Sequence, residues 1–215
     1  MKSGFVGLIG RPNVGKSTLI NSIVGKKVAI TSNKPQTTRN IIQGIYNDEE
    51  TQIVFVDTPG IHKPTHKLGK VLNKQAYYSI NDVDVLLFLI DGSQNLGPGD
   101  KYIIEKLKEQ NKPVILIINK IDKFNKEQLI LKINEYKDDF NEIIPISALK
   151  KNNINTLIKV LRNYLPDNIK YYEEGTISNK TIPFMISEIV REKIFNLTEE
   201  EVPHSITCIT EGIKS

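Results

Sequence analysis

The 215-residue sequence has very little cysteine and no long hydrophobic run. Cys208 is the only cysteine, so an internal disulfide is excluded, and we interpret this residue as a small buried hydrophobe. The apolar start of the chain, residues 1–10, is too short for a signal peptide and lacks a cleavage site. No apolar stretch approaches the ~20 residues that span a bilayer. These absences predict a soluble protein of the reducing cytoplasm.

Charge is distributed unevenly along the chain, although the net charge is only +4. Residues 168–215 carry five Lys/Arg and eight Asp/Glu, a net of −3, which leaves residues 1–167 with 24 basic and 17 acidic residues and a net of +7. A basic first part favours a polyanionic partner such as a nucleotide, RNA or a membrane surface. On charge alone, a solvated lysine-rich surface explains the same numbers equally well.

Short apolar runs alternate with helical patterns over residues 1–165. The runs are almost continuously apolar, which indicates strands of a mostly parallel sheet that helices cover on both faces. The predicted strands are residues 5–10, 41–46, 52–57, 83–91, 113–120 and 142–147, and the predicted helices include residues 16–25 and 156–165. The fold class is therefore α/β, and functional residues are expected at the carboxyl ends of the strands.

GRPNVGKS, residues 10–17, fits the pattern G-x-x-x-x-G-K-[ST] and lies between a predicted strand and a predicted helix. Backbone N–H groups must curl around phosphates in such a loop, so glycine is needed where a Cβ would clash. The following helix N-terminus also favours negative charge. Lys16 would reach the β- and γ-phosphates, and the Ser17 hydroxyl would bind Mg²⁺. A chance glycine-rich turn is the alternative, but it does not account for the flanking strand and helix.

A second strand ends in DTPG, residues 57–60. Asp57 would hold Mg²⁺ through water, and the Gly60 N–H would meet the γ-phosphate. Alone this motif is weak, because Pro-Gly is ordinary turn chemistry. The next residue is Ile61, where Ras-type enzymes place a glutamine that orients the attacking water. Isoleucine cannot form that hydrogen bond, so either hydrolysis is absent or another group replaces the glutamine.

NKID, residues 119–122, predicts the base. Guanine offers two donors, N1–H and the 2-amino group, that the Asp122 carboxylate would accept together, whereas adenine offers no such pair. Asn119 would join the base to the phosphate loop, and the Lys120 stem would cover the ring. SAL, residues 147–149, would offer the Ala148 N–H to guanine O6. These motifs in this order predict GTP rather than ATP, and they argue against a metabolic kinase.

The motifs together resemble the Era family of ribosome-assembly GTPases, in the TrmE-Era-EngA-YihA-septin-like class. The resemblance implies a P-loop NTPase fold of the Ras-like G-domain type, followed by part of a type II KH domain. The segments that carry it are GRPNVGKSTLIN (10–21), KPQTTR (34–39), DTPGIHKPTHKLG (57–69), NKID (119–122), ISEIVREKIFN (186–196) and EEVPHSIT (200–207).

The resemblance also assigns roles that the residues alone do not. Thr38 becomes the switch I threonine that binds Mg²⁺ and senses the γ-phosphate. A hydrophobic residue such as Ile61 is expected in this subclass. In related enzymes a potassium ion, K⁺, held by an asparagine of the phosphate loop does part of the glutamine's work, and Asn13 occupies that position. The implied activity is slow GTP hydrolysis that depends on Mg²⁺ and is stimulated by potassium.

The expected site residues form three sets. The catalytic candidates are Lys16, Thr38, Gly60 and Asn13, and the metal candidates are Ser17, Thr38 and Asp57. The GTP-binding candidates are Gly10, Arg11, Pro12, Asn13, Val14, Gly15, Lys16, Ser17, Thr18, Asp57, Thr58, Pro59, Gly60, Ile61, Asn119, Lys120, Ile121, Asp122, Ser147, Ala148 and Leu149.

Three segments are expected: a G domain at residues 1–167, a polar linker at 168–183 and an incomplete KH-like segment at 184–215. In the last segment a helix is expected at 184–195, with Ile186, Ile189, Val190 and Ile194 on one face, and a strand at 205–210. These apolar faces lack the rest of a KH domain, so the segment is expected to be mobile or held only by the first domain. The sequence leaves open whether the shortening is natural.

By resemblance, the partners are GTP and GDP, the small ribosomal subunit and its 16S rRNA, in whose maturation the protein would act. KH domains clamp RNA with a GXXG loop, and none follows residue 184, so RNA binding is expected to be weak. The resemblance adds peripheral association with the inner face of the cell membrane, and a monomeric state.

Two other functions stay open. One is a GTPase of the same subclass that serves tRNA modification or cell division, against which KPQTTR and the KH-like start argue. The other is a GTP-binding interaction module without hydrolysis, which Ile61 would permit.

Overall fold

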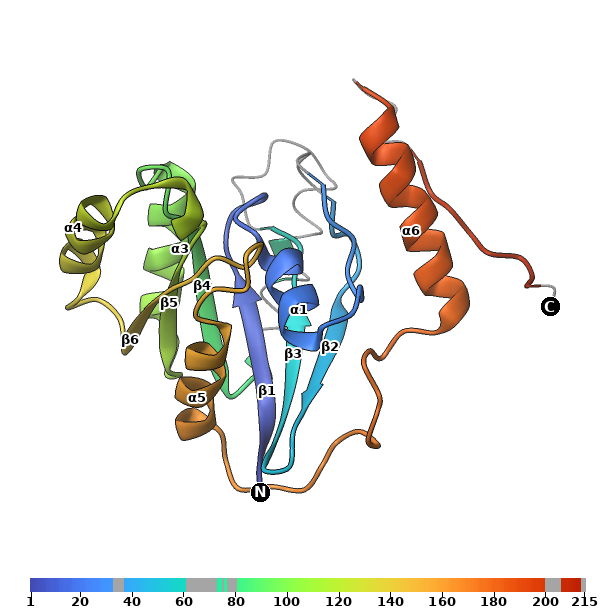
Figure 1. The fold of residues 1–215 in the computed structure, drawn as a ribbon, viewed down its shortest axis with the longest axis horizontal. Helices are drawn as coiled ribbons and strands as arrows, with labels where there is room; N and C mark the ends of the chain where they lie inside the picture. Colours follow the sequence, from blue (N-terminus) through green and yellow to red (C-terminus); the bar gives the residue numbers. More distant parts are fainter. Residues whose placement is uncertain (33–36, 61–72, 75, 77–80, 200–205, 214–215) are drawn as a thin grey trace.

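The computed structural model describes residues 1–32, 37–60, 73–74, 76, 81–199 and 206–213. Within these residues a six-stranded sheet has the order β2-β3-β1-β4-β5-β6 (Figure 1). Its strands are β1 (Lys2–Ile9), β2 (Ile42–Asn47), β3 (Thr51–Asp57), β4 (Val85–Asp91), β5 (Val114–Asn119) and β6 (Glu142–Pro145). β2 pairs with β3 antiparallel and all other neighbouring strands are parallel. The predicted α/β fold with a mostly parallel sheet is confirmed.

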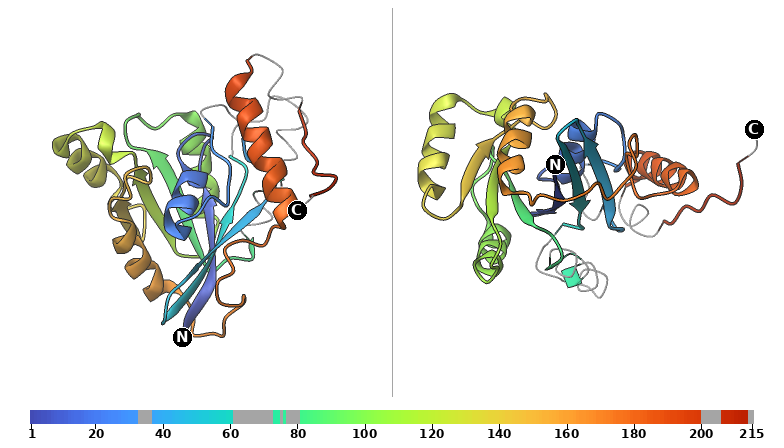
Figure 2. Two further views of the ribbon diagram at one scale, coloured as in Figure 1. Left: turned by 45° about the vertical axis from the view of Figure 1, so that its right-hand side comes forward. Right: turned by 90° about the horizontal axis from the view of Figure 1, so that it is seen from below.

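Helices cover both faces of this sheet (Figure 2). Helices α1 (Lys16–Val24) and α5 (Ile154–Tyr164) contribute apolar side chains to one core, and α3 (Pro98–Lys108) and α4 (Lys126–Tyr136) contribute to the other. Alternate residues of a strand belong to opposite cores: Leu87 and Leu89 of β4 lie in the first, and Phe88 and Ile90 lie in the second. Because both faces are covered, the strand is apolar at every one of these positions.

The element bounds differ from the sequence predictions mainly at the ends. β1 begins at Lys2 rather than at residue 5, because Lys2–Phe5 pair in register with Thr51–Val54 of β3. The predicted turn between β2 and β3 is present, and the Asp48 N–H donates to the Thr51 carbonyl at 2.9 Å.

One strand prediction is wrong. Residues 206–210, the described part of the predicted strand at 205–210, have an irregular conformation, and Cys208 is half-buried rather than buried. A strand needs a neighbouring strand to satisfy its backbone N–H and C=O groups. Within the described residues, none of the six sheet strands lies beside this segment. The apolar alternation of SITCIT was therefore not sufficient to predict a strand.

The segment after α5 packs against the sheet. Residues 166–180, called the strap below, run along the sheet edge formed by β2 (Figure 1). The Ile45 N–H donates to the Ile177 carbonyl at 3.0 Å, and the Tyr171 ring packs edge-on against Phe5 at a centroid distance of 4.7 Å. The strap thus covers part of an edge that would otherwise present unpaired backbone groups.

Gln52 is the main side-chain anchor of the strap. Its amide is fully buried, and its Oε1 accepts from the Tyr171 N–H at 2.6 Å and the Tyr172 N–H at 3.0 Å.

We expect Gln52→Leu to lower the free energy of unfolding by about 2–4 kcal/mol, because two backbone donors lose their acceptor. Denaturant unfolding measures this loss. Gln94→Leu, at an exposed glutamine, is the control, and equal stability of the two variants would contradict this role for Gln52.

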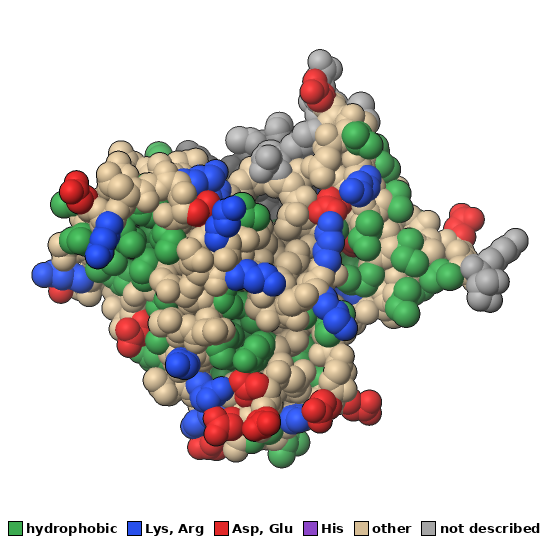
Figure 3. Space-filling view, viewed as in Figure 1, with side chains coloured by type: hydrophobic (Ala, Val, Ile, Leu, Met, Phe, Trp, Pro, Cys, Tyr) green, Lys and Arg blue, Asp and Glu red, His purple; other side chains and the backbone are tan. Residues whose placement is uncertain are grey.

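The last helix, α6 (Ile182–Leu197), contacts the first domain through polar side chains and one phenylalanine. It buries Ser187, Glu188, Arg191, Glu192 and Phe195, whereas the apolar face expected from the sequence is exposed. Ile186, Ile189 and Val190 are 37%, 38% and 47% exposed, and hydrophobic side chains are visible on this part of the surface (Figure 3). The helix is therefore held by the first domain, which was one of the two expected outcomes. Among the helices described, none has the length and hydropathy to span a bilayer.

Candidate nucleotide-binding site

The loop between β1 and α1 is shaped by close backbone approaches. Gly15 has a φ of 104° and caps the start of α1. A Cβ at Gly15 would lie 2.2 Å from Asn119 Nδ2, so only glycine fits against the β5 end. Asn13 is also left-handed, with a φ of 65°. The result is a tight loop that leads directly into the N-terminus of α1. Backbone N–H groups at a helix N-terminus favour the binding of phosphate.

Lys16 is the buried cation of this loop. Its side chain is almost enclosed, and Nζ donates to the Gly10 and Arg11 carbonyls, each at 3.1 Å. Desolvation lowers the pKa of Lys16 to about 8, against the opposing effect of the Asp57 carboxylate. The ammonium is therefore held inside the loop by carbonyl oxygens, where a phosphate oxygen would be a stronger partner.

Three side-chain oxygens gather beside Lys16. Ser17 Oγ donates to Asp57 Oδ2 at 2.7 Å and lies 3.1 Å from Thr38 Oγ1. Asp57 is fully buried, and burial raises its pKa. Its second oxygen, Oδ1, is buried and has no hydrogen-bond partner among the described residues. Hard oxygen donors and an unsatisfied carboxylate oxygen suit a divalent cation such as Mg²⁺. The chemistry of Ser17, Thr38 and Asp57 therefore fits the metal expected from the sequence.

Thr58 and Gly60 bring the DTPG turn against the phosphate loop. Thr58 Oγ1 donates to the Leu8 carbonyl at 2.6 Å, which ties the end of β3 to β1. A Cβ at Gly60 would lie 2.7 Å from Pro12 N, so glycine permits the contact. Gly60 consequently lines the cavity together with Pro12.

Asn119 joins three parts of the site. Its Nδ2 donates to the Val14 carbonyl at 2.8 Å, and its Oδ1 accepts from the Ala148 N–H at 3.0 Å. The link to the phosphate loop agrees with the role expected from sequence. The Ala148 N–H, however, already has an acceptor in Asn119, so a contact to guanine O6 would share this donor.

Lys120 is positioned by a partner that the sequence did not indicate. Its Nζ donates to Asp91 Oδ2 at 2.6 Å and to the Asn13 carbonyl at 2.8 Å. Burial opposes ionisation of Asp91, but hydrogen bonds from Lys120 and Ser93 outweigh it and lower the pKa of this carboxyl group. The Lys120 stem is therefore fixed across the cavity, between β4 and the phosphate loop.

Asp122 is exposed, with its carboxylate oriented by Ser147. Ser147 Oγ donates to Asp122 Oδ1, and the same Oγ accepts from the Lys150 N–H at 3.1 Å. The Ser147 hydroxyl thus accepts one hydrogen bond from the backbone and donates its own proton to the Asp122 side chain. The sequence analysis included Ser147 among the nucleotide-binding candidates, and the structure shows its hydroxyl in contact with Asp122.

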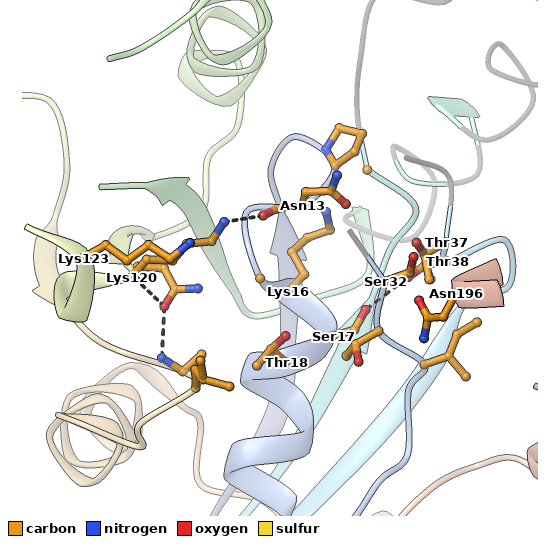
Figure 4. Close-up of a pocket in the computed structure, with 18 of the residues that line it drawn as sticks. Asn13, Lys16, Ser17, Thr18, Ser32, Thr37, Thr38, Lys120, Lys123 and Asn196 are labelled. Carbon is orange, nitrogen blue, oxygen red and sulfur yellow. Dashed lines mark hydrogen bonds between the residues drawn. The ribbon is translucent and has the colours of Figure 1, made fainter. Parts of the chain in front are cut away.

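These residues surround one cavity of about 410 Å³. Figure 4 shows Lys120 and Lys123 on one side, Ser32, Thr37, Thr38 and Asn196 on the other, and Lys16 and Ser17 between them. From the sequence candidates, the cavity is lined by Pro12, Asn13, Gly15, Lys16, Ser17, Thr18, Thr38, Gly60, Asn119, Lys120, Asp122, Ala148 and Leu149. The strand ends thus bring together motifs from over a hundred residues of sequence.

Other sequence candidates do not line the cavity. They are Gly10, Arg11, Val14, Asp57, Thr58, Pro59, Ile121 and Ser147. The Arg11 side chain points to α3, where Nε donates to Asp100 Oδ1 at 2.8 Å. Asp57 is fully buried and accepts hydrogen bonds from Ser17 and Thr38, which do line the cavity. Ile61 falls outside the described residues.

The cavity also contains residues that sequence reasoning missed. They are Ile30, Thr31, Ser32, Thr37, Lys123 and Asn196. Lys123 directly follows NKID, so a wider reading of that motif would have included it. Asn196 comes from α6, and no local pattern connects it to nucleotide binding. Its place in the cavity depends entirely on how α6 contacts the first domain.

The fold and the arrangement of this site define a P-loop GTPase domain. A family model described as 50S ribosome-binding GTPase matches residues 5–120. GTPase Era of Clostridioides difficile (strain 630) is 50% identical over 217 residues, which cover 100% of this chain and 73% of that protein. The chain belongs to the Era family of GTPases.

Two solved structures are similar over nearly the whole chain. One is a crystal structure of Era in complex with MgGDPNP and nucleotides 1506–1542 of 16S ribosomal RNA, with 43% identity and a TM-score of 0.90 over 95% of this chain and 70% of that one. The other is a single-residue variant of Aquifex aeolicus Era bound to GDP.AlF4⁻, with 43% identity and a TM-score of 0.89 over 95% of this chain and 71% of that one. The similarity therefore extends beyond the G domain into α6.

Proposed function

We propose that this chain is a slow, Mg²⁺-dependent GTPase switch that acts in assembly of the small ribosomal subunit and maturation of its 16S rRNA. The observation that carries the proposal is the similarity to Era across the whole chain, and it is supported by the side chains of Ser17, Thr38 and Asp122, which line one cavity. The family model is described by the 50S particle, whereas an Era crystal structure contains 16S rRNA. The proposed partner is the small subunit, because the match to the Era structure with 16S rRNA covers 95% of the chain.

In the proposed binding mode, the cavity holds GTP along its length. Asp122 accepts the two donors of guanine, and Asn119 and Lys120 fix the base side of the cavity to the phosphate loop. Lys16 exchanges its carbonyl partners for phosphate oxygens. Backbone N–H groups of the loop at residues 10–17 surround the phosphates at the N-terminus of α1.

Ser17, Thr38 and Asp57 are the residues that would hold Mg²⁺. A bound Mg²⁺ supplies charge neutralisation at the β- and γ-phosphates. Its proposed use here is supported by the unsatisfied Asp57 Oδ1 and by an Era structure that contains MgGDPNP. The backbone N–H of Gly60 would meet the γ-phosphate, which places the DTPG turn in reach of the reacting group.

Asn13 is the proposed ligand for a potassium ion. A monovalent cation at the phosphates would offset charge that develops during hydrolysis, as an arginine finger does in other GTPases. Asn13 lines the cavity beside Lys16, at the phosphate end. This arrangement would allow hydrolysis although Ile61 cannot orient water by a hydrogen bond.

The proposed domain organisation keeps residues 1–167 as the G domain and 184–215 as a KH-like segment. Most of the connecting segment, 168–183, lies within the strap, where Tyr171 packs on Phe5 and the Ile177 carbonyl accepts from Ile45. The proposed location is the cytoplasm, with peripheral association with the inner membrane face and a monomeric state carried over from the family resemblance.

Co-sedimentation with separated ribosomal subunits tests the ribosomal role. We expect the chain with GDPNP to pellet with small subunits in preference to large subunits, and to be released at higher salt, because part of the attraction comes from the +7 charge of residues 1–167. The matched arm uses large subunits under the same conditions. Preferential pelleting with the large subunit, or with neither subunit, would contradict the proposed role.

A further inference from the structure

Helix α6 places ionisable side chains against the nucleotide site. Arg191 and Glu192 are each 3% exposed and Glu188 is 8% exposed. Charged side chains are almost never buried to this extent unless they are paired. The partners of this buried face therefore indicate what the helix does.

Arg191 is held in a fixed orientation and contacts the backbone of the first domain. Its Nε and Nη2 donate to the two carboxylate oxygens of Glu188 at 2.9 and 2.6 Å, one turn earlier on the helix. Nη2 also donates to the Thr37 carbonyl at 2.8 Å. A bidentate pair of this kind fixes the guanidinium plane, so the contact to Thr37 has a defined direction.

Glu192 holds a second point of the same region. Its Oε1 accepts from the Thr31 N–H at 2.9 Å, and its Oε2 accepts from Lys27 Nζ. The Arg39 guanidinium lies over the Phe195 ring at 5.5 Å. The buried face of α6 therefore contacts residues on both sides of the segment 33–36, which lies outside the described residues.

The contact at Thr37 bears directly on Thr38. The Thr37 carbonyl and the Thr38 N–H belong to one trans peptide. Both bonds lie in the peptide plane, and they point in opposite directions. Fixing the carbonyl toward Arg191 thus directs the Thr38 N–H to the opposite side and limits where the Thr38 side chain can go. Thr38 lines the nucleotide cavity, and its Oγ1 lies 3.1 Å from Ser17 Oγ.

We propose that Arg191, oriented by Glu188, is a positioning residue that holds Thr38 in the arrangement used for the γ-phosphate and Mg²⁺. The tail helix then takes part in distinguishing GTP from GDP. This inference rests on the proposed function. Because coupling between two sites is reciprocal, GTP binding would strengthen the docking of α6 by the same factor.

The test compares binding of GDPNP and GDP by the full chain and its Arg191→Ala variant. We expect GDPNP affinity to fall roughly tenfold, within the usual range of coupling between sites, with GDP affinity unchanged, because GDP lacks the γ-phosphate. Arg191→Lys retains the charge but not the forked geometry, so it should recover only part of the preference. Equal losses for both nucleotides would indicate general damage and overturn the proposal.

A double-mutant cycle shows whether Arg191 acts through Thr38. Thr38→Ala and Arg191→Ala should be strongly non-additive in GDPNP affinity, whereas independent contributions would add and would overturn the proposal. Arg162→Ala is the matched control, because the Arg162 guanidinium also forms a forked ion pair, in its case with Asp48 and Glu50, but lies outside the cavity. An unmodified chain that binds neither nucleotide would refute the proposed function. Normal binding with an unchanged preference in Arg191→Ala would refute this inference alone.

Discussion

Asp122→Asn is expected to reduce GTP affinity by roughly 10³-fold or more and to create affinity for xanthosine triphosphate. The carboxylate accepts both guanine donors, whereas an amide presents one acceptor and one donor. Ser147 Oγ donates to Oδ1 at this position, so the amide oxygen of the variant would face Ser147 and its NH₂ would face the base. That NH₂ opposes the donors of guanine but matches the 2-carbonyl of xanthine.

Competition against a fluorescent guanine nucleotide measures this exchange of specificity. Asp138→Asn is the matched control, since it makes the same charge change at an exposed position outside the cavity. Ser147→Ala in the Asp122→Asn background should weaken the xanthine preference, because the amide is then free to turn over. If Asp122→Asn retains its GTP affinity, guanine is recognised by some other group.

Removal of the Asn13 amide is expected to abolish stimulation of hydrolysis by potassium. We expect a basal GTPase rate of roughly 10⁻⁴–10⁻² s⁻¹, with a higher rate in potassium than in sodium. Asn13→Ala should bring the potassium rate down to the sodium rate. Single-turnover phosphate release in matched chloride salts measures the difference.

Backbone strain must be separated from the loss of the amide, because Asn13 has a φ of 65°. Alanine is disfavoured in this left-handed conformation, whereas glycine adopts it freely. Asn13→Gly therefore removes the amide without the backbone penalty and should lose potassium stimulation equally. Retention of stimulation in Asn13→Gly would mean that the backbone shape, rather than the side chain, supports hydrolysis.

Local sequence determined much of the fold and the candidate site. The continuously apolar strands, the Gly-Lys-Ser turn and the order of the motifs depend on neighbouring residues, so periodicity and spacing were sufficient to predict them. Gly15 illustrates this, because its need for a positive φ and for close approach follows from the phosphate loop itself.

Long-range contacts could not be predicted in the same way. Lys120 depends on Asp91, and Thr37 depends on Arg191, yet nothing in either local pattern indicates its partner. The helical periodicity of α6 drew attention to its apolar face, such as Ile189 and Val190, although the charged face is the buried one. Periodicity identifies a helix and its faces, but which face is covered depends on the surface that the helix meets.

This chain is expected to hydrolyse GTP in preference to ATP. The most direct measurement is phosphate release from GTP by the unmodified chain with Mg²⁺ and potassium, in the presence and absence of excess ATP. Turnover within roughly 10⁻⁴–10⁻² s⁻¹ that excess ATP does not inhibit is the result expected. Inhibition by ATP at concentrations equal to GTP, or phosphate release no faster than in buffer alone, would contradict the claim.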